Sequence, residues 1–141
     1  MRRLPDGTAS RCASRLTEVQ FGLHQSGPQR HRLVSKWAGR SAGFERRAGF
    51  ATMAHLAARG ARAQHAIDDA VLIGFLPLIE AAATDERTYV KKAVNWALRG
   101  IGKSSPALAA HAERTARRLQ AADDRTARWV GRHRMGEVFG G

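Results

Sequence analysis

The side chains best suited to binding a charged ligand fall in one stretch of the chain, between residues 89 and 103. At 100° per residue along a helix, Lys92, Arg99 and Lys103 lie together on one side, and Trp96 lies beside them. Lysine and arginine neutralise phosphates, while an indole stacks on a base or lies against a sugar. The alternative is that Trp96 packs against a neighbouring helix and that the cations are solvated. The combination predicts a surface that binds nucleic acid.

The charge of the whole chain favours the same interpretation. The 141 residues include 24 Lys and Arg against 12 Asp and Glu, which gives a formal net charge of +12 at pH 7. Such an excess predicts a polyanionic partner, most often nucleic acid, with an anionic membrane surface as the alternative. No predicted helix combines a bulky apolar face with a lysine-rich one, and no apolar stretch is long enough to span a bilayer. We therefore expect DNA binding and no membrane association.

Helices are the elements that must position these side chains. From about Arg32 onward the apolar residues recur at helical spacing, and no segment alternates with period two over more than a few residues. The predicted helices span about residues 32–38, 43–58, 68–82, 86–101, 105–121 and 124–135. Short turns between helices make neighbours antiparallel. The sequence therefore predicts an all-α fold in which antiparallel helix pairs stack as a helical repeat.

Local signals predict where several of these helices begin. Ser105 and Pro106 fit an N-cap and a first helical position. Thr84 is predicted to cap the helix that carries Trp96, so that Asp85 and Glu86 would occupy its first turn. The apolar side of that helix should face the core. It consists of Tyr89, Val90, Ala93, Val94, Ala97, Leu98 and Ile101.

Two further helix boundaries are predicted from Gly and Pro. Gly60 is expected to end the helix that begins near residue 43. Pro77 should bend the helix 68–82 or interrupt its regular hydrogen bonding, because proline lacks an N–H donor.

The first 34 residues differ in composition from the rest. Gly, Ser, Arg and Gln dominate there, so we assign 1–34 as an irregular segment, with a short helix around 16–23 as the alternative, and 35–141 as a helical domain. The single cysteine, Cys12, cannot form an internal disulfide, which fits a reducing compartment. No apolar stretch of a secretory signal follows Met1. We expect a cytoplasmic protein.

Three stretches of the chain resemble the AlkD-like family of DNA alkylation repair glycosylases. The most specific is VKKAVNWALRGIGK, within FLPLIEAAATDERTYVKKAVNWALRGIGKSSPAL at residues 75–108. FERRAGFATMAHL at 44–56 and ARWV at 127–130 are similar to other helices of the family, so that the resemblance covers about residues 35–135. It implies a HEAT-like repeat solenoid with a concave basic groove for double-stranded DNA. It also implies excision of purines alkylated to a positive charge, such as 3-methyladenine and 7-methylguanine, without flipping the base into a pocket.

The resemblance also implies roles for particular residues. The family's late-helix tryptophan matches Trp96, and its groove arginine matches Arg47, with Arg46 as the other candidate. Family enzymes further use a tryptophan followed one turn later by an aspartate, which stabilises positive charge developing on the sugar. Trp37 has no such aspartate, because residues 39–41 are Gly, Arg and Ser.

We therefore assign no catalytic residue and leave open whether the chain is an enzyme. The prediction is a DNA-binding helical-repeat protein that binds alkylated DNA and is catalytically incomplete. The alternative is a non-catalytic helical-repeat scaffold that binds protein or DNA.

No cofactor, nucleotide or metal ion is expected. GIGKSS at 100–105 resembles the end of a phosphate-binding loop, but Ala97 stands where that loop requires Gly, and the preceding chain is predicted to be helical. The six histidines are scattered without the spacing of a compact metal site. The carboxylate pairs at 68–69 and 123–124 fall where helices begin, which accounts for them without chemistry.

We expect duplex DNA binding that weakens steeply as salt is added, because each neutralised phosphate releases counterions. The slope of log affinity against log salt should be about −0.9 per phosphate contacted and several units in total. Fluorescence anisotropy between about 50 and 200 mM salt measures this slope. Undetectable or salt-independent binding would contradict the electrostatic interpretation.

Overall fold

The computed structural model describes residues 28–61 and 68–139, and helices are the only regular elements in these two ranges. They are α2 (Pro28–Ala38), α3 (Gly43–Ala61), α4 (Asp69–Ala82), α5 (Thr88–Gly102), α6 (Pro106–Gln120), α7 (Arg125–Arg132) and α8 (Gly136–Phe139). The prediction of an all-α fold is confirmed. Cys12 and the helix considered for 16–23 lie outside the described residues.

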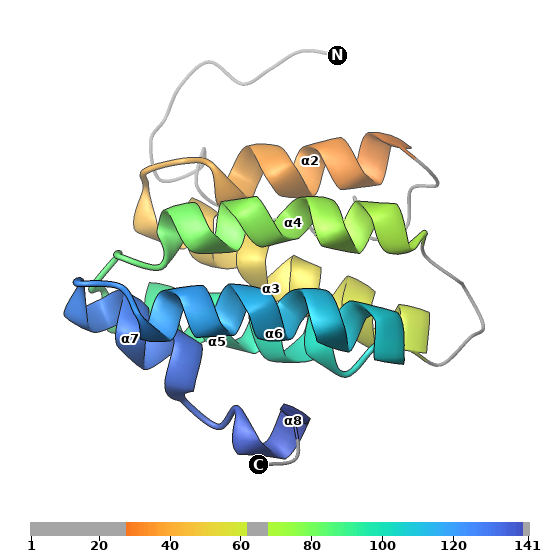
Figure 1. The fold of residues 1–141 in the computed structure, drawn as a ribbon. Helices are drawn as coiled ribbons and strands as arrows, with labels where there is room; N and C mark the ends of the chain where they lie inside the picture. Colours follow the sequence, from red (N-terminus) through yellow and green to blue (C-terminus); the bar gives the residue numbers. More distant parts are fainter. Residues whose placement is uncertain (1–27, 62–67, 140–141) are drawn as a thin grey trace.

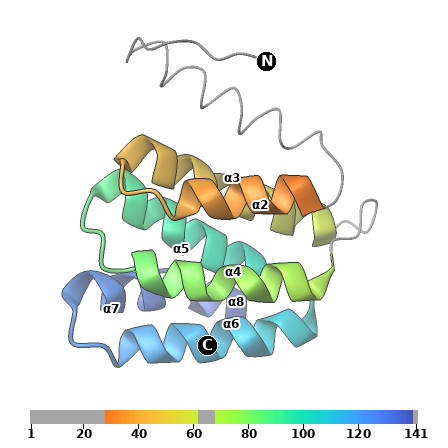
Figure 2. The same cartoon turned by 90° about the horizontal axis from the view of Figure 1, so that it is seen from above.

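The six longer helices form two layers. Helices α2, α4 and α6 make one layer, here called the outer layer, while α3, α5 and α7 make the other, the inner layer (Figures 1 and 2). The outer helices run in one direction and the inner helices in the opposite one, as Figure 1 shows. Consecutive helices thus form three antiparallel pairs that stack side by side, which is the packing predicted from the sequence.

The hydrophobic core lies between these layers. Phe50, Met53 and Leu56 of α3 and Leu98 and Ile101 of α5 all have 0% of their surface exposed. Burial of side chains of this size stabilises a fold by about 1.5–3 kcal/mol each. The stability of the stack therefore comes from contacts between the layers. The outward side of the inner layer is available for contacts with other molecules. None of the described helices is long and apolar enough to cross a membrane.

The predicted core face of α5 is confirmed except at Tyr89. The other six residues are buried, namely Val90, Ala93, Val94, Ala97, Leu98 and Ile101. The side chain of Tyr89 is 39% exposed, so its assignment to the core was wrong. Its ring lies along the first turn of α3, where a Cβ at Gly43 would come 3.0 Å from Tyr89 Cε2. The missing side chain of Gly43 makes room for the ring outside the core.

Three helix starts agree with the sequence. The side chain of Ser105 accepts a hydrogen bond from the backbone N–H of Leu108 at 3.2 Å, and Pro106 occupies the first turn of α6. Asp124 caps α7 through the N–H of Ala127 at 2.9 Å. Asp68 caps α4 in the same way. Each cap satisfies one of the N–H groups that a helix leaves without a partner at its start.

The predicted cap at Thr84 is wrong. Helix α5 begins at Thr88, after an N-cap at Arg87 that makes no side-chain capping bond. Asp85 and Glu86 precede the helix instead of lying in its first turn. The carboxylate of Asp85 accepts hydrogen bonds from Arg87 Nε at 2.9 Å and from Arg46 Nη1 at 3.0 Å. Pairing with Arg87 and with the distant Arg46 thus engages the carboxylate of Asp85, which the sequence analysis had placed in the first turn of the helix.

Other boundaries also differ from the predictions. Helix α2 begins at Pro28 instead of near residue 32, and α3 includes Gly60 and ends at Ala61. Helix α4 (Asp69–Ala82), by contrast, agrees with the predicted span 68–82, and the exposed Pro77 lies inside it as expected. Helix α7 ends at Arg132, short of residue 135, since the backbone turns extended at His133 and left-handed at Arg134, where φ is 58°.

Replacing Gly49 with alanine should destabilise the fold. A Cβ there would lie 2.7 Å from Ala38 Cα and 2.9 Å from the carbonyl carbon of Trp37, so α2 would have to move. We expect a loss of about 1–3 kcal/mol in the free energy of unfolding, measured with urea.

Gly74→Ala is the matched control for this substitution. A Cβ at Gly74 meets nothing within 4 Å, so alanine should stabilise α4 by about 0.5–1 kcal/mol. Equal effects of the two substitutions would contradict the close approach of α2 and α3.

Candidate nucleic-acid interface

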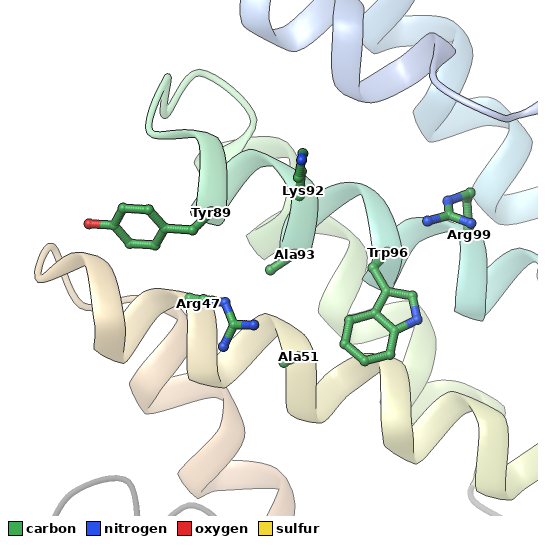
Figure 3. Close-up of a pocket in the computed structure, with 7 residues that line it drawn as sticks. All are labelled: Arg47, Ala51, Tyr89, Lys92, Ala93, Trp96 and Arg99. Carbon is green, nitrogen blue, oxygen red and sulfur yellow. The ribbon is translucent and has the colours of Figure 1, made fainter. Parts of the chain in front are cut away.

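A groove of about 390 Å³ lies on the inner layer between α3 and α5. We call it the α3/α5 groove (Figure 3). It is lined by Arg47, Ala51, Tyr89, Lys92, Ala93, Trp96 and Arg99.

Helical spacing brings this lining to one side of each helix. On α5, Tyr89, Lys92, Trp96 and Arg99 follow one another at intervals of three or four residues, which places them along one strip. Alanines from both helices lie between the polar rows in Figure 3, and their small side chains leave the groove open. The structure thus brings together four of the residues that the sequence singled out: Arg47, Lys92, Trp96 and Arg99.

Trp96 is a surface residue of this groove. Its side chain is 39% exposed, and its ring meets that of His55 edge to face at a centroid distance of 5.1 Å. Figure 3 shows the indole projecting from α5 toward α3. Trp96 is therefore not buried between helix pairs, although it contacts α3 through His55.

Two of the three cations in the groove are uncommitted. The side chains of Arg47 and Lys92 are exposed and make no hydrogen bond or ion pair with any residue in the described ranges. The third, Arg99, is held in place: its Nε donates to Asn95 Oδ1 at 2.8 Å, and its Nη1 lies 4.0 Å from Glu137 Oε1. The groove therefore offers two free cations and one fixed cation to an anionic ligand.

Asn95 ties this fixed cation to α7. The asparagine is 1% exposed, and its Nδ2 donates to the carbonyl oxygens of Val130 at 2.9 Å and His133 at 3.1 Å. Its Oδ1 is the acceptor for Arg99. One buried amide thus sets both the end of α7 and the direction of a groove-lining guanidinium.

The positive potential of the groove extends to His133. Burial lowers the pKa of His133, and the nearby charges of Arg99, Arg134 and Lys92 lower it further, while Glu137 opposes them. Each effect except that of Glu137 disfavours the imidazolium form. His133 is therefore neutral at pH 7.

Arg46, the other candidate for the groove arginine, points elsewhere. Its Nη1 donates to Asp85 Oδ2 at 3.0 Å and its Nε to the carbonyl oxygen of Arg40 at 2.9 Å. Hydrogen bonds from Arg87, with that from Arg46, lower the pKa of Asp85 to about 2 although partial burial opposes them. The carboxylate is thus charged at neutral pH and holds Arg46 away from the groove. Of the two candidates, only Arg47 lines it.

Lys103 and Trp37 also lie outside the groove lining. Lys103 is the exposed C-cap of α5, beyond the last groove residue. Trp37 of α2 is 1% exposed and packs with Leu33 and with Ala48 of α3, with the Arg40 guanidinium 5.7 Å from its ring centroid. Trp37 is therefore a core residue.

Sequence reasoning missed Phe44 at this site, and it noted Tyr89 near the cationic strip but assigned it to the core. Phe44, one turn before Arg47 on α3, is 63% exposed and stacks on Tyr89 at a centroid distance of 5.5 Å. With Trp96 they are the large hydrophobic side chains exposed in the described part of the chain, and all three lie at the α3/α5 groove. The spacing of three residues between Phe44 and Arg47 is the sequence signal that could have placed Phe44 on the groove side of α3.

None of the described residues that line the groove carries a carboxylate. Within residues 28–61 and 68–139, no group of three or more His, Cys, Asp or Glu side chains could hold a metal ion. The described lining can therefore bind anions, aromatic rings and cationic rings.

An all-α stack with a cationic groove on one layer is typical of helical-repeat proteins, which present extended surfaces to their partners. The chain matches the family model described as DNA alkylation repair enzyme over residues 3–130, and it belongs to that family. The match includes most of residues 1–34, where the sequence itself showed us no resemblance. No curated protein and no solved structure matches the chain.

Trp96→Ala should weaken DNA binding and leave the fold largely intact. Stacking of an aromatic side chain on a base contributes about 1–3 kcal/mol, so the dissociation constant should rise roughly 10- to 100-fold. Anisotropy measures the affinity, and a thermal melt measures the stability.

Trp37→Ala makes the same substitution in the core, where loss of a buried tryptophan costs about 3–5 kcal/mol. A comparable loss of stability in Trp96→Ala would show that Trp96 is structural.

Proposed function

We propose that this protein binds duplex DNA in the α3/α5 groove and holds there a purine nucleotide alkylated to a positive charge, such as 3-methyladenine or 7-methylguanine. The observation that carries the proposal is the set of groove-lining residues: three cations and two exposed aromatic rings, with no carboxylate among the described lining. Membership of the DNA alkylation repair enzyme family and the net charge of +12 support it.

The cations and the aromatic rings would contact different parts of the DNA. Arg47 and Lys92, which have no partner among the described residues, would neutralise backbone phosphates. Trp96 and Tyr89 would contact the base or sugar. An aromatic face attracts a cationic ring more strongly than a neutral one. The groove would then bind an alkylated purine more tightly than a normal purine without needing a shaped pocket.

Base excision by this groove should be slow. Cleavage of the glycosidic bond builds positive charge on the sugar, and a carboxylate close to that charge lowers the barrier. Loss of one preorganised electrostatic group commonly reduces a rate about 100- to 1000-fold. Asp85, the carboxylate paired with Arg46, does not line the groove. The weakened bond of a cationic purine would leave only slow release, assisted by the aromatic surroundings.

We therefore expect the protein to bind DNA carrying 7-methylguanine but to release little of the base. The test counts free base by mass spectrometry after incubation, against DNA without protein. Multiple-turnover release well above that background would contradict the proposal that excision is slow.

Trp96→Ala is the control for the origin of any release. Release that depends on the α3/α5 groove should fall in this variant, whereas release by a contaminating enzyme should not change. Equal affinity for alkylated and unmodified duplex would contradict recognition of the cationic base.

A further inference from the structure

The last described helix, α8, follows α7 through a sharp change of direction. In Figure 1 it lies below α5 and α7, on the opposite side from α2 and α4. The backbone is extended at His133 and left-handed at Arg134, where φ is 58°. A residue with a Cβ rarely adopts this left-handed conformation. The turn brings α8 against the end of α5 at Gly102. We call residues 133–139 the C-terminal strap.

The strap places a carboxylate beside a cation of the α3/α5 groove. Glu137 Oε1 lies 4.0 Å from Arg99 Nη1, and Glu137 Oε2 accepts a hydrogen bond from Arg134 Nε at 3.0 Å. Arg47 and Lys92, the other two cations of the described lining, have no carboxylate partner within the described ranges. A guanidinium binds carboxylate and phosphate oxygens in the same way. Glu137 therefore stands where a phosphate oxygen would approach Arg99.

Few contacts hold the strap in place. Met135 is 5% exposed, but α8 itself contains no buried residue. Val138 and Phe139 are half-buried, and the strap meets α5 where Gly102 has no side chain. A cavity of about 320 Å³ separates part of the strap from α6. A segment with so few buried apolar contacts opens at a lower free energy than the core helices.

Resting on the proposed function, we propose that the C-terminal strap is autoinhibitory. In the free protein Glu137 occupies Arg99, and in the complex a phosphate of the DNA takes its place and the strap moves away. An exposed or half-exposed ion pair contributes little, so closing the strap should lower the affinity for DNA by about 2- to 5-fold. The strap thus acts as a weak competitor that is always present.

This competition would sort ligands by how far they extend along the groove. A polyanion that contacts only Arg47 and Lys92 leaves the strap closed and gains nothing from Arg99. A DNA segment that also reaches Arg99, beside Trp96, replaces one oxyanion with another there. Opening of the strap would then accompany a ligand that fills the whole groove.

Glu137→Gln tests the role of the carboxylate, because it removes the charge and keeps the length of the side chain. The dissociation constant for duplex DNA should fall about 2- to 5-fold, measured by anisotropy. Glu80→Gln is the charge-matched control, since Glu80 pairs with Arg118 in the outer layer at 2.9 Å. At about 0.15 M salt the Debye length is about 8 Å, so this distant change should leave the affinity unaltered.

Gly102→Ala tests the seat of the strap without changing any charge. A Cβ there would lie 2.7 Å from Val138 Cγ1 and 3.4 Å from Phe139 Cε1, so the strap would have to shift. The affinity for DNA should rise as it does in Glu137→Gln. Gly100→Ala is the matched control on the same helix, because its Cβ would make an ordinary contact of 3.5 Å with Ala57 Cβ. It should keep the parent affinity.

Hydrogen exchange gives a readout of the strap that does not depend on affinity. The backbone N–H groups of Val138 and Phe139 donate to the carbonyl oxygen of Met135 at 3.0 and 2.9 Å. Saturating DNA should speed the exchange of these two amides, because the strap leaves its seat. Slower or unchanged exchange would show that the strap stays closed in the complex and would overturn the proposal.

The affinities distinguish the remaining outcomes. Unchanged or weaker DNA binding by Glu137→Gln and Gly102→Ala, in variants that melt like the parent protein, would show that the strap does not compete and would overturn the proposal. An equal gain in Glu80→Gln would assign the effect to net charge and would also overturn it. Absence of DNA binding by the parent protein would instead contradict the proposed function itself.

Discussion

Repulsion between like charges is the constraint on which the inner layer depends. Three cations converge on the α3/α5 groove without a carboxylate in the described lining, and this arrangement disfavours the folded state. Close packing of α3 against α5 must offset the repulsion. The two helices approach closely at Gly100 of α5, where a Cβ would already be in van der Waals contact with Ala57 Cβ at 3.5 Å and with Ala54 Cα at 3.6 Å. The small residues that bring the helices together also bring the cations together.

A single carboxylate organises the end of the groove near Tyr89. Asp85 pairs with Arg46 of α3 at 3.0 Å and with Arg87 at the start of α5 at 2.6 Å. Arg87 Nη2 also donates to the carbonyl oxygen of Ser41 at 2.9 Å, so the turn before α3 is joined to the turn before α5. This cluster fixes the relative position of two helix starts. It also pairs with the arginine next to Arg47, so that of these two neighbours only Arg47 offers a free positive charge to the groove.

The parts of the fold that the sequence predicted depend on local chemistry, and the parts that it missed depend on distant partners. The cap at Ser105 needs only a hydroxyl and an N–H three residues later, so its prediction was confirmed. The cap at Thr84 failed where Asp85 pairs with Arg87, two residues later, and with Arg46, 39 residues earlier. The ion pair with Asp85 holds Arg46 away from the groove that Arg47 lines. Helical spacing alone did not decide which of the two arginines lines the groove. The position of Trp96 beside the cations of its helix was predicted correctly, because it depends only on the spacing of these residues along the helix.

The two layers differ in how their charges are compensated. On α6 in the outer layer, Arg117 pairs with Glu113 at 2.6 Å and Arg118 with Glu80 of α4 at 2.9 Å. On the inner layer Lys92 and Arg132 have no such partner among the described residues. The cations without a partner therefore concentrate positive potential on the groove side of the described inner layer. This potential attracts a polyanion toward that side before contact. The frequency of productive encounters is thereby raised, and it falls as ionic strength screens the field.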